Sequence, residues 1–253
     1  PGIYIDDEFT QGIEIQQVLN PQVRSQALKV VHDMFAFDVA SDAEEDMPVS
    51  EIKIQKTIER IVENILSNGD IMCNVLDIKN YDDYIYYHSI NVAMMSVLLG
   101  ANYGMNEESL YQLTTAAILH DIGKIAVPDA VLNKPSRLTD GEYELMKKHT
   151  IWGKEILAGL EFLPQADMGA AYHHERFDGK GYPYGIKGDK IPDIVRIISA
   201  ADSLDAMSSN RCYRRHCDKD YIISEFEKGA GTQFDADVAQ VVVELIKEGR
   251  IIL

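Results

Sequence analysis

Apolar residues recur at three- and four-residue intervals along most of this chain, which is the spacing of amphipathic helices. Between residues 50 and 67, for example, isoleucine occupies positions 52, 54, 58, 61 and 65. Similar patterns predict helices over residues 21–36, 85–101, 106–120, 219–228 and 235–248. Two further helices are predicted, one that starts at residue 139 and presents residue 149, and one that starts after residue 192 and carries residue 202. Strands and helices do not alternate, so we predict that the main domain is all-α.

Local capping signals indicate where several of these helices begin. Thr139 and Glu142 have the spacing of a capping box, which predicts the start of the helix that presents His149. Asn106 and Asp218 each precede a helical pattern and are predicted N-caps.

The first 47 residues differ in pattern from the rest. Residues 2–5 and 12–15 alternate apolar and polar side chains, which is compatible with a short β-hairpin. Residues 41–47 form an acidic stretch with few apolar side chains, typical of a solvated linker. We therefore predict an N-terminal regulatory or connecting segment over residues 1–47 and the main, catalytic domain over residues 48–253.

Composition narrows the class of protein. The chain has 253 residues, of which 46% are hydrophobic, and a formal charge of −17 from 24 basic and 41 acidic residues. This charge disfavours a nucleic acid polymer or an anionic membrane as partner. No apolar run approaches the roughly 20 residues of a membrane span. Three cysteines without a CxxC spacing favour a reducing, cytoplasmic location.

The strongest chemical signal is a charged pair, His120 and Asp121, within an apolar helical run that continues to Gly123 and Lys124. Burying an imidazole beside a carboxylate is costly unless another group compensates, and a metal ion does so effectively. A lone pair of this kind is weak evidence, because a core histidine that is hydrogen-bonded to its neighbour explains it equally well. The metal interpretation therefore depends on further ligands elsewhere in the chain.

Further candidate ligands are present. They are His88, His149, His173, His174 and Asp202. Together with the first pair they make five histidines and two aspartates, which suits two adjacent metal ions if one carboxylate bridges them. Considered alone, the adjacent histidines at 173 and 174 are equally compatible with surface residues. Lys124 follows Asp121 by three residues, so its ammonium can reach a ligand held at the metals if the helix continues. Otherwise it is a surface lysine.

Four motifs together resemble the HD-GYP domain, a bacterial branch of the HD phosphohydrolases. The motifs are His120-Asp121-Ile122-Gly123-Lys124, His173-His174-Glu175, Gly181-Tyr182-Pro183 and Ala201-Asp202-Ser203-Leu204-Asp205-Ala206. The resemblance extends from about Tyr84 to the C-terminus. It implies an HD-type helical bundle and a cyclic di-GMP phosphodiesterase that opens the dinucleotide to linear pGpG and often continues to GMP.

The resemblance also implies roles for the candidate ligands. One metal ion would be held by His88, His120, Asp121 and Asp202, and the other by Asp121, His149, His173 and His174. In this family the ions are usually iron, with manganese as the alternative. A hydroxide activated by the two ions would attack phosphorus, with Asp121 bridging them. Lys124 would stabilise the developing charge or protonate the leaving group. Asp205 would orient the water, although a plain helix-surface position is an equal alternative.

Substrate contacts are implied in two other segments. Arg211 and Arg214 match phosphate-contacting positions of the family, and guanidinium groups suit phosphate oxygens. The loop of Gly181, Tyr182 and Pro183 would form one wall of the substrate site. Its glycine would permit close backbone approach.

One departure from the family pattern concerns the number of metals. Some members hold a third ion through a glutamate four residues before the first histidine, and here that position is Tyr84. We therefore expect two divalent ions per chain.

Other functions and partners stay open at this point. The chain can instead be a module that senses cyclic di-GMP or docks signalling proteins with little turnover. An oxygenase and a hydrolase of another cyclic dinucleotide are further alternatives. The isoleucine spacing over residues 50–67 is compatible with a homodimer. The chain begins at Pro1 without an initiator methionine, which is compatible with an upstream sensor or receiver domain.

Overall fold

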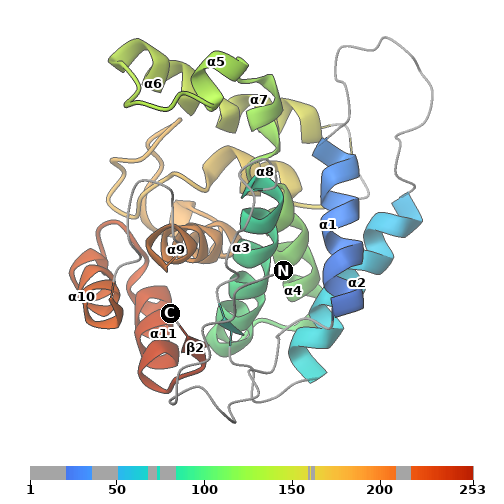
Figure 1. Cartoon of the computed structure of the whole chain (residues 1–253). Coiled ribbons are helices and arrows are strands. Elements are labelled where there is room, and N and C mark those ends of the chain that lie inside the picture. The colour runs from blue at the N-terminus through green and yellow to red at the C-terminus, as the bar shows by residue number, and fades with distance from the viewer. Residues whose placement is uncertain are drawn as a thin grey trace, which may run out of the picture.

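The computed structural model describes residues 21–35, 51–67, 73–74, 84–158, 160, 163–208 and 218–252 (Figure 1). The predicted hairpin, the acidic stretch at 41–47, Arg211 and Arg214 lie outside these residues.

The described part of the chain is all-α, as predicted. Its longer helices are α1 (Pro21–Phe35), α2 (Glu51–Ser67), α3 (Tyr84–Tyr103), α4 (Glu107–Leu119), α6 (Asp140–Lys147), α7 (His149–Leu157), α8 (Ala166–Tyr172), α9 (Asp193–Ser208), α10 (Lys219–Gly229) and α11 (Ala236–Lys247). Shorter elements are η1 (Ile122–Ala126), α5 (Asp129–Leu132) and η2 (Gly188–Lys190). Two-residue strands, β1 (Cys73–Asn74) and β2 (Ile251–Ile252), pair in parallel.

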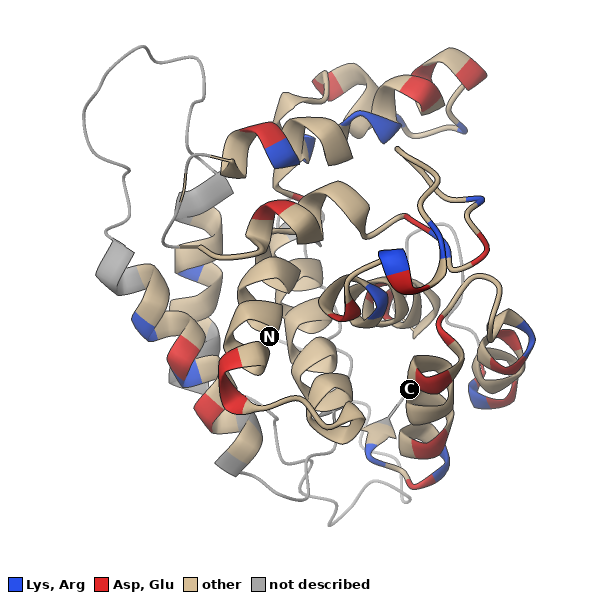
Figure 2. Ribbon diagram, turned by 180° about the vertical axis from the view of Figure 1, so that it is seen from behind, with Lys and Arg blue, Asp and Glu red and all other residues tan. Residues whose placement is uncertain are grey.

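Helix α3 is the central helix of the bundle and packs against α4, α9, α11 and α1 (Figure 1). Its 20 residues include no Asp, Glu, Lys or Arg, and every residue from His88 to Gly100 is buried. Charged residues are instead distributed over the surrounding helices and loops (Figure 2). A helix that is apolar on all sides belongs in a core. His88, at the start of this buried stretch, is therefore surrounded by protein.

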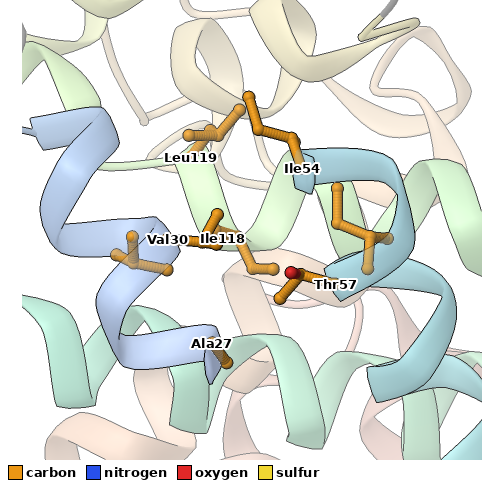
Figure 3. Close-up of a pocket in the computed structure, with 8 residues that line it drawn as sticks. Ala27, Val30, Ile54, Thr57, Ile118 and Leu119 are labelled. Carbon is orange, nitrogen blue, oxygen red and sulfur yellow. The ribbon is translucent and has the colours of Figure 1, made fainter. Parts of the chain in front are cut away.

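The two N-terminal helices share this core. Ala27 and Val30 of α1 and Ile54 of α2 belong to the same hydrophobic cluster as α3 and α4. A small apolar cavity lies where α1, α2 and α4 meet (Figure 3). Its lining includes Ile118 and Leu119, which directly precede the first histidine of the HD motif. The predicted domain boundary near residue 48 falls between α1 and α2, which pack into one core. The division into two domains stays a prediction.

The two predicted N-caps and the predicted capping box are confirmed. The side chains of Asn106 and Asp218 accept hydrogen bonds at 2.9 Å from the amides of Ser109 and Tyr221. The capping box between Thr139 and Glu142 is complete.

The prediction that this capping box starts the helix presenting His149 is wrong. Helix α6 ends at Lys147, and His149 is instead the first residue of α7. The physical reason is that the Lys148 amide donates a hydrogen bond to the carbonyl of Leu145, which tightens the last turn of α6 and ends it.

Among the helices that the structure describes, none combines the length and the apolar character that a membrane span requires.

Candidate metal centre

All seven predicted metal ligands meet where α3, α4, α7, α8 and α9 converge. Three groups, each with ligand atoms within 4.8 Å of one another, cover the set: His149, His173 and His174; His88, His120 and Asp202; and His120, Asp121 and His173. Most of them lie at helix ends. The central pair follows α4, the histidine at 149 begins α7, and the adjacent histidines follow α8, whereas the ligands at 88 and 202 lie within α3 and α9.

The two carboxylate oxygens of Asp121 face different histidines. Oδ2 lies 3.3 Å from Nε2 of His120 and 3.6 Å from Nε2 of His88. Oδ1 lies 3.5 Å from Nε2 of His149 and 3.7 Å from Nε2 of His173. A carboxylate between two sets of imidazole nitrogens has the position that a bridging ligand requires.

Backbone carbonyls orient three of the imidazoles. Nδ1 of His120 donates to the carbonyl of Ala117 at 2.7 Å, and Nδ1 of His149 donates to that of Met146 at 2.7 Å. Nδ1 of His173 donates to the carbonyl of Gly169 at 3.0 Å. A carbonyl oxygen can only accept, so in the neutral form of each ring the proton is on Nδ1 and the lone pair of Nε2 faces the centre. This is the usual outer-shell arrangement of metal-binding histidines.

The interior of the site fits positive ions. Nε2 of His120 and Oδ1 of Asp121 are buried and have no hydrogen-bond partner among the residues that the structure describes. Nε2 of His149 lies 3.2 Å from Nε2 of His173, although the protons of both rings are on Nδ1. Converging lone pairs and an unpartnered carboxylate oxygen are unfavourable in a buried site unless a cation lies among them. The imidazole and carboxylate donors that the described residues supply suit iron, manganese or similar ions.

His88 has a different partner. Its Nδ1 donates to Oδ2 of Asp205 at 2.7 Å, and its Nε2 lies 3.3 Å from Oδ1 of Asp202. The other oxygen of Asp205 accepts a hydrogen bond from the side-chain amide of Asn91, whose Nδ2 lies 2.9 Å away. Asp205 is completely buried, so the structure places its carboxylate behind the ring of His88 and not on the helix surface.

Burial and neighbouring charge determine the protonation of the ligands. Burial lowers the pKa of His173 well below its usual value, and it lowers the pKa of His174 to about 4. These rings are therefore neutral near pH 7. Burial alone would lower the pKa of His88 as well. Hydrogen bonds to three aspartates outweigh this effect and raise the pKa of His88 well above the usual value.

Asp121 remains ionised in this environment. Burial alone would raise its pKa, but the charge of Lys124 and its contacts with His120 and His88 hold the pKa well below its usual value. The ammonium of Lys124 is hydrogen-bonded to Oδ2 of Asp121. The structure thus places the predicted catalytic lysine directly against the central carboxylate.

The Gly-Tyr-Pro loop lies against the segment that carries the adjacent histidines. The Tyr182 amide donates to the carbonyl of His174 at 3.2 Å, and the two rings lie 4.7 Å apart. A Cβ at Gly181 would lie 2.5 Å from the Cα of Glu175, so only glycine permits this approach. The peptide bond between Tyr182 and Pro183 is cis.

Three residues support the site in roles that the sequence alone did not indicate. Oε1 of Glu175 accepts from the amides of Tyr184 at 2.7 Å and Gly185 at 3.0 Å, which holds the loop in place. A Cβ at Gly123 would lie 1.9 Å from the carbonyl oxygen of His149. The sequence carried a signal for Asn91, which follows His88 by three residues and so lies one helical turn away.

Comparison with known proteins places these features in a family. A family model described as HD domain matches residues 71–238. A cyclic di-GMP phosphodiesterase of Thermotoga maritima is 36% identical over 203 residues, which cover 77% of this chain and 54% of that protein. A cyclic di-GMP phosphodiesterase of Pseudomonas aeruginosa is 30% identical over 75% of this chain and 46% of that protein. A 3'3'-cGAMP-specific phosphodiesterase of Vibrio cholerae is 35% identical over 62% of this chain and 30% of that protein.

The chain therefore spans about half the length, or less, of these curated relatives. Among solved structures, an HDG"Y"P protein from Bdellovibrio bacteriovorus has the same fold. The TM-score is 0.69, the identity is 19%, and the match covers 89% of this chain and 70% of that one.

Proposed function

The chain belongs to the HD domain family, and from this premise we propose that it is a metal-dependent phosphodiesterase that hydrolyses cyclic di-GMP to linear pGpG. The substrate class follows the names of its relatives, which are phosphodiesterases of cyclic di-GMP and of 3'3'-cGAMP. The family identification from the sequence motifs is confirmed; the products stay a proposal.

The observation that carries the proposal is the position of Asp121. Its two oxygens face separate histidines, so one ion would be held by His88, His120, Asp121 and Asp202 and a second by Asp121, His149, His173 and His174. Iron is our first choice, with manganese as the alternative. When bound, such a pair of ions supplies Lewis-acid chemistry that activates water and offsets charge on the phosphoryl oxygens.

The residues of the chain itself have distinct tasks in this proposal. Lys124 lies against Asp121 and would stabilise negative charge on the phosphoryl group or protonate the departing ribose oxygen. Asp205 would hold His88 in its tautomer and direction, since both of its oxygens are occupied. This positioning role replaces the water-orienting role as our preferred interpretation.

Substrate binding is assigned to two segments. Gly181, Tyr182 and Pro183 would form a wall beside the second ion, where the Tyr182 ring lies against His174. Arg211 and Arg214 would contact phosphate, as the resemblance implies. A homodimer, an upstream sensor or receiver domain and a cytoplasmic location also stay predictions.

The test is a product assay. Protein purified without oxygen and loaded with Fe(II) or Mn(II) is incubated with cyclic di-GMP, 3'3'-cGAMP or cyclic di-AMP, and the products are separated by chromatography. We expect linear dinucleotide from cyclic di-GMP with the wild type and none with Asp121→Ala. If the wild type binds the dinucleotide but leaves it intact, the receptor alternative is favoured instead.

A further inference from the structure

Lys147 lies near the metal centre, yet it belongs to none of the four sequence motifs. It is the last residue of α6. Its Nζ lies 5.5 Å from the centroid of the Tyr182 ring and 5.4 Å from that of Tyr143. Because the Tyr182 ring lies 4.7 Å from the ring of His174, the ammonium is one aromatic ring away from a proposed metal ligand. This places Lys147 at the rim of the centre.

The ammonium of Lys147 is held only weakly where it is. It pairs with Glu144 at 2.6 Å, but the Glu144 side chain is 66% exposed. An ion pair of this kind contributes little to stability, so replacing Glu144 by another anion as the partner of Lys147 costs little free energy. Lys124 differs, because its partner Asp121 is buried and central to the site.

The surroundings of Lys147 are fixed before any ligand arrives. Helix α6 is anchored at its start by the capping box and by an ion pair of 2.5 Å between Lys134 and Glu142. On the other side, the carboxylate of Glu175 holds the loop that carries Tyr182. Because the helix and the loop on either side of Lys147 are already in position, less conformational freedom is lost when a ligand binds there.

We propose that Lys147 binds the second phosphate of the cyclic dinucleotide, the one that is not being cleaved. This inference rests on the proposed function. A cyclic dinucleotide carries two phosphodiester groups, and when one lies at the metals the sugar-phosphate ring holds the other away from them. In a chain of charge −17, that anion needs local positive charge. A lysine at the rim supplies a compact charge with three hydrogen-bond donors.

The experiment compares steady-state kinetics of Lys147→Met with those of the wild type, both loaded with Mn(II). Loss of a charge-assisted hydrogen bond to phosphate should raise KM for cyclic di-GMP by about tenfold or more, with a much smaller change in kcat. Lys147→Arg, which keeps the charge, should recover most of the affinity. Raising the salt concentration should weaken binding more in the wild type than in Lys147→Met.

Lys154→Met is the matched control. Nζ of Lys154 lies 5.7 Å from the Tyr172 ring and 5.5 Å from the Tyr184 ring, and these two rings lie 5.6 Å from each other, so the variant removes the same kind of contact from a different pair of tyrosines. Its KM should equal that of the wild type. Thermal melting verifies that each variant is folded. Bis(p-nitrophenyl) phosphate has a single phosphate, so its KM should rise less in Lys147→Met than that of the dinucleotide.

An unchanged KM in Lys147→Met, or an equal rise in Lys154→Met, would overturn the inference. If the wild type gives no product, the proposed function fails, and calorimetric titration with cyclic di-GMP then tests Lys147 separately. About tenfold weaker binding by Lys147→Met would support the phosphate contact without turnover. Equal binding, or no binding by either protein, would refute it.

Discussion

The carboxylate of Asp205 accepts a hydrogen bond from Nδ1 of His88 at 2.7 Å, across 117 positions of sequence. Its second oxygen is bonded to Asn91, and the residue is completely buried. Because Asp205 is completely buried, its carboxylate has no exposed atom to offer a substrate. Its effect on hydrolysis should therefore act through His88.

Replacing Asp205 should weaken metal binding. Loss of such a partner typically reduces metal affinity by roughly 10- to 100-fold, so we expect this range for Asp205→Ala and a smaller loss for Asp205→Asn, which keeps an acceptor. Competition with a chromophoric chelator measures the affinity. Asp220→Asn, at an exposed position on α10, is the control. Unaltered affinity in Asp205→Ala would restore the water-orienting role.

Metal binding should release a proton from His88 near neutral pH. Burial disfavours its charged form, but hydrogen bonds to Asp121, Asp202 and Asp205 raise its pKa well above the usual value, so the metal-free ring is charged. The ion must displace that proton, and affinity should therefore rise with pH until the metal-free ring is neutral. Calorimetry in buffers of different ionisation enthalpy counts the protons. Neither proton release nor pH dependence is expected if the metal-free ring is already neutral.

The same raised pKa affects the metal-free protein. The charged form of His88 is favoured by folding, so its contribution to stability is fully present below the unfolded pKa of about 6.5. That contribution is lost as the pH rises through the higher folded pKa. Bound metal removes this dependence because the proton is absent.

The backbone of η1 lies very close to the backbone of α7 at Gly123. An added Cβ would lie 1.9 Å from the carbonyl oxygen of His149 and 2.4 Å from the amide nitrogen of Gly153. Because these are backbone atoms, they cannot rotate away, and Gly123→Ala should destabilise the fold by about 3 kcal/mol or more. In Gly141→Ala the Cβ meets no atom of the described residues within 4 Å, so we expect a neutral or slightly stabilising change. Chemical denaturation compares the two, and equal stability would contradict the close approach of η1 to α7.

Glu175 should control the loop without affecting metal content. Glu175→Ala removes the acceptor of the Tyr184 and Gly185 amides, so hydrogen exchange at these two amides should accelerate and turnover should fall. Glu175→Gln keeps an acceptor oxygen and should lose less. Metal analysis is the control, because the carboxylate does not belong to the ligand groups. Unchanged exchange in Glu175→Ala would show that the loop is held by other contacts.

Periodicity and capping predicted the helices well because those signals are local. The caps at Asn106 and Asp218 are examples. The break between α6 and α7 was missed, since a single 3₁₀-type bond at Lys148 decides it. The contact of His88 with Asp205 could not be predicted from the sequence either, because it depends on how α3 and α9 pack. Lys147 escaped notice for the same reason, since its relation to Tyr182 arises only when α6 lies beside the loop.

The most direct test of the account is a metal titration of metal-free protein under anaerobic conditions, with linear dinucleotide formation as the readout. We predict that turnover is absent without metal, rises with added Fe(II) or Mn(II), and becomes constant at two ions per chain. Asp121→Ala should stay inactive throughout. Turnover by the metal-free protein, or a rise that continues to a third ion, would contradict the two-metal centre built on Asp121.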